Sequence, residues 1–344
     1  MSPGRARPGA ADEADGVLTG LALARSALDR AGARRADTEW LAAAWADEAT
    51  RVLVLDGAQA LVRFGEEGTE RGRARSAGAG QASLVLVSPS QAPEGVRFLL
   101  GQDGAGVVYF GVAGPPGGLG AGPLPARGSG PDTPPPPGLR PAGLREAGPL
   151  LSDRDAGMLT HAVALANWHT THTHCPRDGT PTMPINAGHA RRCPADNSEH
   201  FPRVDPAVIM LVTDDDDRCL LARNRNWPPR RVSILAGFVE PGESAEQTVM
   251  REVSEEAGLL ASDIRYVGSQ PWPMPQSLML GFRARARGAQ EIRVDEEEIA
   301  EARWYSREQL RAAVLEGEVL LPPPVSIAHR IIESWYGEPL PGSW

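Results

Sequence analysis

The apolar residues of this chain fall into short runs at first and into longer, periodic patterns later. Before residue 113 the runs hold about five residues each and are bounded by Gly, Asp or Pro, which is typical of β-strands. A short helix is expected ahead of them at residues 38–48. The sequence predicts strands at residues 51–55, 60–64, 83–87, 96–100 and 107–112. We therefore expect a disordered tail at 1–20 and a β-rich N-terminal domain at 21–150, whose residues lack catalytic spacing.

A change of composition follows this domain. Residues 113–138 are rich in Gly and Pro, which predicts a flexible or partly extended loop because such sequence cannot build a core. Ser152 then precedes a helical pattern that has Asp155 at its third position and runs to about residue 168. This helix and the segment that follows it form the region 151–203.

The pattern from residue 204 to 344 alternates strands with helices, which predicts an α/β domain. Ser306 with Gln309 forms a capping box ahead of one helix, and three prolines at 322–324 separate that helix from the last one, at residues 326–335. The expected strands lie at residues 207–212, 219–222, 232–238, 264–269, 278–286 and 301–305.

One helix of this domain is unusually acidic. Ser244 and Gln247 form its capping box, and Gly258 is placed to end it in a left-handed conformation. Its glutamates Glu252, Glu255 and Glu256 lie at i, i+3 and i+4, on one face, where like charges repel one another. A hard divalent cation such as Mg²⁺ or Mn²⁺ prefers oxygen ligands of this kind and would offset the repulsion.

Composition narrows the classes of function and location. The formal net charge is -9, so broad electrostatic attraction to nucleic acid or to an anionic membrane is not expected. Every basic side chain is Arg. The chain has neither an apolar run long enough to span a bilayer nor a secretory apolar region near its start. Its three cysteines do not suggest a disulfide framework. These features predict a cytoplasmic protein.

Two of the three cysteines belong to a repeated pattern. Cys175-Pro-Arg-Asp178 and Cys193-Pro-Ala-Asp196 would form a four-cysteine zinc site if both aspartates were cysteines. One interpretation is a variant zinc site built from these four residues, with His174 or His200 as a further ligand. The other, which we favour, is a ribbon that has lost its metal, because two thiolates and two carboxylates compete poorly for zinc.

Residues 237–259 resemble the Nudix box, G-x5-E-x7-R-E-U-x-E-E-x-G-U, in which U is aliphatic, and match it at every fixed position. The resemblance to Nudix hydrolases implies a loop–helix–loop on an α/β/α sandwich with a mixed sheet. It also implies cleavage of a nucleoside diphosphate linked to another group. The matching residues are Gly237, Glu243, Arg251, Glu252, Val253, Glu255, Glu256, Gly258 and Leu259.

A second stretch narrows the resemblance. Residues 269–277 read S-Q-P-W-P-M-P-Q-S and are similar to the array that follows the box in NADH pyrophosphatases of the NudC type, with Met274 in place of Phe. Three prolines beside a Trp make a stiff segment suited to the wall of a pocket for a flat ring. The segment in which two of the four expected cysteines are present, Cys175 and Cys193, also lies where that family has a zinc site. Together these features cover roughly residues 151–337.

The resemblance implies a role for particular residues. Metal binding is expected from Glu252, Glu255, Glu256 and Glu298, assisted by the carbonyl of Ala236. Glu256 is the expected general base, with Glu255 and Glu298 as alternatives, and Arg251 is expected to orient carboxylates with Glu243. The implied substrate-binding residues are Phe201, Phe238, Gln270, Pro271, Trp272, Pro273, Met274, Pro275, Gln276, Ser277 and Ala328.

The reaction implied is hydrolysis of NAD⁺ or NADH to NMN(H) and AMP, and removal of NAD caps from RNA 5′ ends is a further expectation. Phe201 and Ala328 would close the site across the interface of a homodimer. Two alternatives stay open. One is a Nudix hydrolase of ADP-ribose or another dinucleotide, and the other is a nucleotide-sensing module without activity. Basic residues available for RNA are Arg223, Arg225, Arg230 and Arg231, which also fit a solvated strand edge.

Overall fold

The computed structural model describes residues 16–65, 81–114 and 138–343, and their backbone divides into two compact units. Of the described residues, the C-terminal unit comprises 16–24, Asp205–Pro271 and 277–343. The N-terminal unit comprises Arg25–Val204 and the short segment Trp272–Gln276. No helix among the described residues combines the length and the apolar character that crossing a membrane requires.

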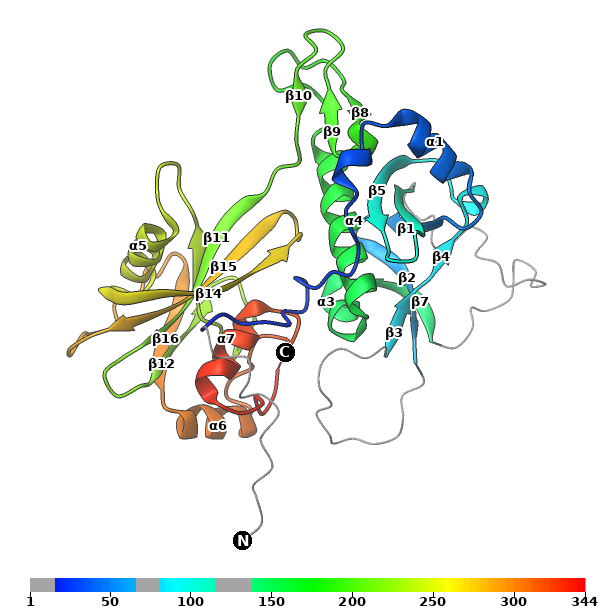
Figure 1. The fold of residues 1–344 in the computed structure, drawn as a ribbon. Helices are drawn as coiled ribbons and strands as arrows, with labels where there is room; N and C mark the ends of the chain where they lie inside the picture. Colours follow the sequence, from blue (N-terminus) through cyan, green and yellow to red (C-terminus); the bar gives the residue numbers. More distant parts are fainter. Residues whose placement is uncertain (1–15, 66–80, 115–137, 344) are drawn as a thin grey trace. The chain divides into compact units, whose positions relative to one another are not determined.

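The C-terminal unit is built on a six-stranded mixed sheet (Figure 1). Its central strand, β11, runs parallel to β15 and antiparallel to β12 and β13. The strands follow the order β14-β15-β11-β12-β16, with β13 paired to β11. Their bounds are β11 (Asp205–Thr213), β12 (Cys219–Asn224), β13 (Leu235–Phe238), β14 (Ala261–Trp272), β15 (Ser277–Ala286) and β16 (Ile299–Tyr305).

Helices cover both faces of this sheet, which confirms the predicted α/β/α sandwich (Figure 1). Successive side chains of a strand point to opposite faces. Val208, Met210 and Val212 of β11 accordingly share a core with α5, whereas Ile209 and Leu211 share one with α7. A continuous apolar run is what a strand buried on both faces requires. The helices are α5 (Ala245–Ala257), α6 (Arg307–Leu315) and α7 (Ile327–Tyr336).

The ends of α5 follow the prediction from sequence. The Ser244 hydroxyl accepts from the Gln247 backbone N–H, and the Gln247 side chain accepts from the Ser244 N–H, so the capping box is complete. Gly258 ends the helix with a φ of 69°. The capping box that Ser306 and Gln309 form at the start of α6 is likewise present.

A segment from the start of the chain belongs to the C-terminal unit. The Leu18 N–H donates to the Val267 carbonyl at 2.7 Å, and Leu21 and Leu23 are buried. The Leu23 N–H donates to the side-chain oxygen of Gln270 at 3.3 Å. Residues 1–15 of the expected disordered tail lie outside the described residues.

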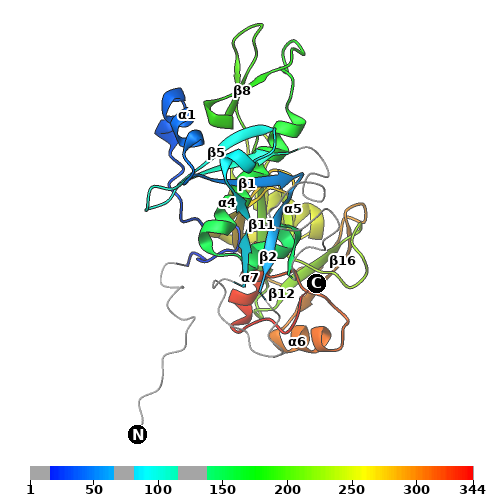
Figure 2. The same cartoon turned by 90° about the vertical axis from the view of Figure 1, so that its right-hand side faces the viewer.

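The N-terminal unit contains a seven-stranded sheet in the order β3-β2-β1-β6-β5, with β4 paired to β1 and β7 paired to β2. Helix α4 packs on β1 and β5 (Figure 2). The strands are β1 (Arg51–Asp56), β2 (Gln59–Phe64), β3 (Ala82–Leu84), β4 (Leu86–Val87), β5 (Val96–Gln102), β6 (Val108–Ala113) and β7 (Leu139–Gly143). The α-helices are α1 (Thr38–Ala46), α3 (Leu144–Ala147) and α4 (Asp153–Thr171).

This sheet differs from the prediction in two places. The single strand expected at 83–87 is two strands, because the Val85 N–H bonds to the Leu61 carbonyl and the chain changes partner from β2 to β1 there. The sequence pattern does not predict strand β7, because Pro141 and Gly143 are both uncommon inside strands. Of the Gly/Pro-rich loop at 113–138, residues 115–137 lie outside the described residues.

The predicted ribbon is a small three-stranded sheet of its own within the N-terminal unit. Its strands, in the order β10-β9-β8, are antiparallel. They are β8 (Met183–Ile185), β9 (Ala190–Arg192) and β10 (Glu199–His200).

Candidate functional site

Helix α5 presents two buried glutamates and one exposed glutamate on the face predicted from sequence. Glu252 and Glu256 are 8% and 6% exposed, one helical turn apart, whereas Glu255 is exposed. The inner face of the same helix carries Val249 and Val253, which pack into the core against β11. Because Val249 and Val253 pack into the core, the carboxylates of Glu252 and Glu256 lie at its edge and are buried there.

Arg251 joins the loop before α5 to the carboxylates on it. Its Nε and Nη2 donate to the two oxygens of Glu243 at 2.7 and 2.9 Å. Its Nη1 donates to Glu252 Oε1 at 2.8 Å and to Glu255 Oε2 at 2.9 Å, and its Nη2 also donates to the Phe238 carbonyl at 2.9 Å. These bonds lower the pKa of Glu243 to about 2 and raise the pKa of Arg251. One guanidinium thus fixes the loop and two carboxylates together.

Thr248 is part of this arrangement, and sequence reasoning did not identify it. Its hydroxyl donates to Glu243 Oε2 at 2.9 Å, and its side chain is fully buried. A polar residue on the inner face of an amphipathic helix, one turn after the capping serine, is the sequence signal that marks it.

Gly237 lies directly against the carboxylate of Glu252. A Cβ at position 237 would stand 1.9 Å from the Glu252 Cδ and 1.9 Å from its Oε1. Position 237 lies on β13, where its neighbour Ala236 pairs with Ile209. Glycine is therefore required here by the close approach of a carboxylate to the backbone rather than by an unusual φ.

Glu298, just before β16, completes the acidic cluster. Its negative charge helps to raise the pKa of both Glu252 and Glu256, although burial is the larger cause for each. The pKa of Glu256 rises to about 8, against the effect of a backbone hydrogen bond from Ala236. Residues far apart in sequence are thus brought within electrostatic reach.

The donor set of this cluster fits a hard divalent cation. All of its side chains offer carboxylate oxygens, the ligands that Mg²⁺ and Mn²⁺ prefer. Glu256 Oε2 is buried and has no hydrogen-bond partner among the described residues. Buried polar atoms are almost always paired, and a cation is one partner that would satisfy this oxygen.

The expected substrate residues of the C-terminal unit differ in exposure. Phe238 is 59% exposed, at the end of β13 and next to the acidic cluster. Gln270 is completely buried, where its side-chain NH₂ donates to the Val325 carbonyl at 3.0 Å. Ala328 is buried in α7. Phe238 is therefore accessible at the surface, whereas Gln270 and Ala328 are buried in the interior of the C-terminal unit.

The Trp-Pro array is divided between the two units. Pro271 and Ser277 belong to the C-terminal unit, and Trp272–Gln276 belongs to the N-terminal unit. There the Asn167 side-chain NH₂ donates to the carbonyls of Pro273 and Pro275 at 2.9 and 3.1 Å. The Arg145 guanidinium stands 5.2 Å from the centre of the Trp272 ring. Phe201, 65% exposed, also belongs to the N-terminal unit.

The four ribbon residues gather as the sequence pattern predicted. Ligand atoms of Cys175, Cys193 and Asp196 lie within 4.8 Å of one another, and Cys193 Sγ lies 3.8 Å from Asp178 Oδ2. Both carboxylates already accept backbone hydrogen bonds: Asp178 from the Thr180 N–H and Asp196 from the Ser198 N–H, each at 2.9 Å.

Comparison with protein-family models covers most of the chain. The models described as "NADH pyrophosphatase-like rudimentary NUDIX domain", "NADH pyrophosphatase zinc ribbon domain" and "NUDIX domain" match residues 49–168, 170–201 and 203–322. A zinc ribbon domain is therefore present, and the Nudix domain is of a class that uses divalent metals. The first of these models shows that residues 49–168 resemble a rudimentary Nudix domain, which the strand pattern of this region did not indicate.

Named relatives agree with these models. Over 200 residues the chain is 48% identical to a protein of Mycobacterium tuberculosis named "NAD-capped RNA hydrolase NudC". It is 41% identical over 197 residues to the human "NAD-capped RNA hydrolase NUDT12". The matches cover 56% and 54% of this chain, and 64% and 42% of those proteins. A solved Nudix hydrolase from Nitrosomonas europaea aligns with a TM-score of 0.39 at 19% identity, over 49% of this chain and 95% of that one.

Proposed function

Because this chain belongs to the Nudix superfamily, and within it to the NADH pyrophosphatase family, we propose that it is a metal-dependent pyrophosphatase that hydrolyses NAD(H) to NMN(H) and AMP. The observation that carries the proposal is the carboxylate cluster of α5 and Glu298, in which the buried Glu256 Oε2 is unpaired. An inactive nucleotide sensor would not need this cluster, which is electrostatically unfavourable without a cation.

In this proposal Glu252, Glu255, Glu256 and Glu298 hold Mg²⁺ or Mn²⁺, with the Ala236 carbonyl as a further ligand. The bound cation supplies neutralisation of the pyrophosphate and a lowered pKa of an attacking water. Glu256 is the proposed general base because of the resemblance to the family. Glu255 and Glu298 are the alternatives. Arg251 keeps Glu252 and Glu255 in place through the bonds described above.

The proposed substrate residues explain the choice of a nicotinamide dinucleotide. Phe238 offers an exposed ring beside the cluster, on which a base or a nicotinamide can stack. The resemblance to the family also assigns substrate binding to the segment from Gln270 to Ser277, to Phe201 and to Ala328. Support for this assignment comes from the resemblance of the array and from the names of the relatives.

Removal of NAD caps from RNA is part of the same proposal, because both relatives are named for it and the bond cleaved is the same pyrophosphate. Hydrolysis of ADP-ribose or another dinucleotide is the competing activity within the superfamily.

A single comparison tests the proposal. Purified protein is assayed with Mg²⁺ or Mn²⁺ for release of AMP from NADH, ADP-ribose and a diadenosine polyphosphate. NADH is expected to be preferred. The Glu256→Gln variant is expected to lose at least about a hundredfold in rate, because removing one charged group from a catalytic site typically forfeits several kcal/mol.

Glu246→Gln is the matched control, since Glu246 is exposed on the first turn of the same helix. It is expected to keep its rate. Preference for ADP-ribose over NADH would favour the competing activity. If Glu256→Gln were as active as Glu246→Gln, the carboxylate cluster would not take part in hydrolysis.

Three finer points complete the proposal. A cytoplasmic location agrees with the three free cysteines of the described residues. A homodimer is proposed from the expected role of Phe201. The ribbon is proposed to hold its shape without zinc, and the contacts of Asp178 and Asp196 support this.

A further inference from the structure

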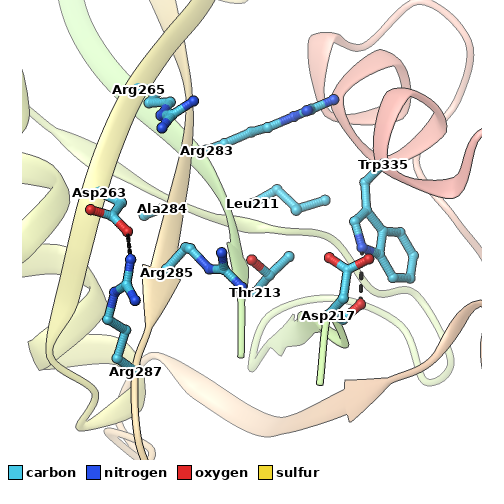
Figure 3. Close-up of a pocket in the computed structure, with 10 residues that line it drawn as sticks. All are labelled: Leu211, Thr213, Asp217, Asp263, Arg265, Arg283, Ala284, Arg285, Arg287 and Trp335. Carbon is cyan, nitrogen blue, oxygen red and sulfur yellow. Dashed lines mark hydrogen bonds and ion pairs between the residues drawn. The ribbon is translucent and has the colours of Figure 1, made fainter. Parts of the chain in front are cut away.

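The C-terminal unit contains a cavity that plays no part in the proposed catalysis (Figure 3). Its volume is about 330 Å³. It lies at the far end of the sheet from the Trp-Pro array. Ser277 pairs with Asp205 at one end of the parallel strands β15 and β11, whereas Arg285 pairs with Thr213 at the other end. Eight residues of strand separate the two ends, roughly 26 Å at about 3.3 Å per residue.

The cavity opens on the face of the sheet opposite to α5. Leu211 and Trp335 line it, and both belong to the core that β11 shares with α7. The carboxylate cluster of α5 lies beyond the other face. A ligand in this cavity would therefore be separate from one bound at the acidic cluster.

Arginines dominate the lining. Arg283 and Arg285 alternate along β15 and so share one face, Arg287 follows directly after the strand, and Arg265 joins them from β14 (Figure 3). Two carboxylates, Asp263 and Asp217, also line the cavity. Four guanidiniums against two carboxylates leave a formal charge of +2, in a protein whose net charge is -9.

Both carboxylates are already engaged. Asp263 pairs with Arg287, and Asp217 pairs with Arg307, which is outside the lining, at 2.8 Å. In the described part of the chain, Arg265, Arg283 and Arg285 form no ion pair. The Arg283 Nη2 donates to Ser334 Oγ at 2.7 Å.

Two of these guanidiniums have buried donors that are unsatisfied. The Nε atoms of Arg283 and Arg285 are inaccessible and have no hydrogen-bond partner among the described residues. A ligand in the cavity would not reach these inaccessible Nε atoms, so the terminal Nη atoms of the guanidiniums would be its donors. Guanidinium groups match the oxygens of a phosphate in pairs, which makes Arg the usual residue for such groups.

We propose that this cavity binds a compact anion that carries more than one phosphate group, of which inorganic pyrophosphate is the simplest. Several positive charges around one small space require several negative charges in the ligand. The cavity offers no ring for stacking, because Trp335 is only 6% exposed and the Arg307 guanidinium covers it at 4.6 Å. Single-stranded nucleic acid depends on such stacking, so the cavity does not suit it.

Calorimetric titration of the full chain in EDTA at low salt tests this site. EDTA removes divalent cations, so the acidic cluster repels the probe. Pyrophosphate is expected to bind one per chain. Arg285→Gln is expected to weaken binding at least about tenfold, and Arg285→Lys less, because a charged hydrogen bond is lost in the first and the charge is kept in the second. Arg265→Gln changes an exposed residue and provides a second variant that does not disturb the core.

Two controls separate this site from the rest of the protein. Arg311→Gln removes one positive charge from the exposed surface of α6 and is expected to leave binding unchanged. Glu256→Gln is also expected to keep binding, so failure of the proposed catalytic function would not affect this result. The proposal is overturned by absence of saturable binding, by equal weakening in Arg311→Gln, or by a ten-nucleotide single-stranded RNA that binds more tightly than pyrophosphate.

Discussion

At the scale of single residues, the acidic site depends on how closely a backbone and a carboxylate approach. The spacing of the Nudix box places a glycine at 237, but spacing gives no reason for it. The structure supplies one, because the Glu252 carboxylate occupies the volume that a Cβ would need. Gly242, in the same loop, is different: it has a φ of 94°, and a Cβ there would meet nothing within 4 Å.

These two glycines give a matched pair of variants. Gly237→Ala is expected to displace Glu252 and reduce metal-dependent NADH hydrolysis by about a hundredfold or more, a loss of roughly 3 kcal/mol in activation free energy. Gly242→Ala is expected to lower the free energy of unfolding by about 1–2 kcal/mol through its φ, with little loss of rate. Rates and urea unfolding measure the two effects. Equal rates in both variants would contradict the steric argument.

At the scale of elements, the two aspartates of the ribbon form hydrogen bonds within their own turns. In the described residues, the Asp178 and Asp196 side chains accept N–H groups two positions onward, the geometry of an Asx turn. Asp196 also accepts from the Ser198 hydroxyl at 2.6 Å and pairs with Arg177 at 3.3 Å. Hydrogen bonds to these two carboxylates therefore stabilise the two turns that carry Cys175 and Cys193.

Metal analysis of the purified protein tests this interpretation. Well under one zinc per chain is expected, and EDTA is expected to shift the melting temperature by no more than about 1–2 °C, because no structural metal would be removed. Asp196→Ala is expected to destabilise the ribbon, whereas Glu199→Ala, whose carboxylate pairs with Arg192 on the exposed surface, serves as its control. One zinc per chain would contradict the prediction.

A second element-scale feature is a pair of buried histidines in the N-terminal unit. The rings of His161, on α4, and His189, after the turn at Asn186–Gly188, are centred 5.1 Å apart. Burial is the main cause that lowers their pKa values, to about 2 and about 4. The charges that face them are Arg30 and Arg35, with His169 beside His189. Carbonyls of Leu100 and Leu99 oppose the shifts.

These pKa values predict sensitivity to acid. Both folded-state values lie below the unfolded value of 6.5, so the unfolded chain binds more protons and stability falls as the pH drops from about 6.5 towards 4. The His189 shift alone is worth on the order of 3 kcal/mol. Urea unfolding between pH 4 and 7 should show a flatter profile for His189→Gln than for the wild type. His174→Gln, at an exposed site, should retain the wild-type slope.

At the scale of the whole molecule, chain order and spatial grouping do not coincide. Residues 16–24 belong to the C-terminal unit although they precede the N-terminal unit in sequence. Trp272–Gln276 belongs to the N-terminal unit although it lies within the sequence of the C-terminal unit. Large apolar side chains are exposed on the N-terminal unit, among them Phe201, Val204 and Met183. Burial of these side chains against a second copy would be favourable.

The predicted homodimer can be tested by light scattering. The expected mass is twice 36.6 kDa, because these side chains would be buried between two copies. Phe201→Ser is expected to lower both the mass and the rate of NADH hydrolysis. Leu315→Ser, at an exposed apolar residue of α6, is the matched control. A wild-type mass of 36.6 kDa would rule out the dimer at that concentration.

The sequence by itself determined the features that depend on local spacing. The caps of α5 and α6, the shared face of Glu252 and Glu256, and the mixed α/β fold all follow from helical and strand periodicity. The tertiary structure decided which distant residues meet. It brought Glu298 to α5, split the strand at 83–87 between two partners, and gathered arginines of β14 and β15 around one cavity. Strand pairing and burial join residues through space, and a linear pattern does not specify those neighbours.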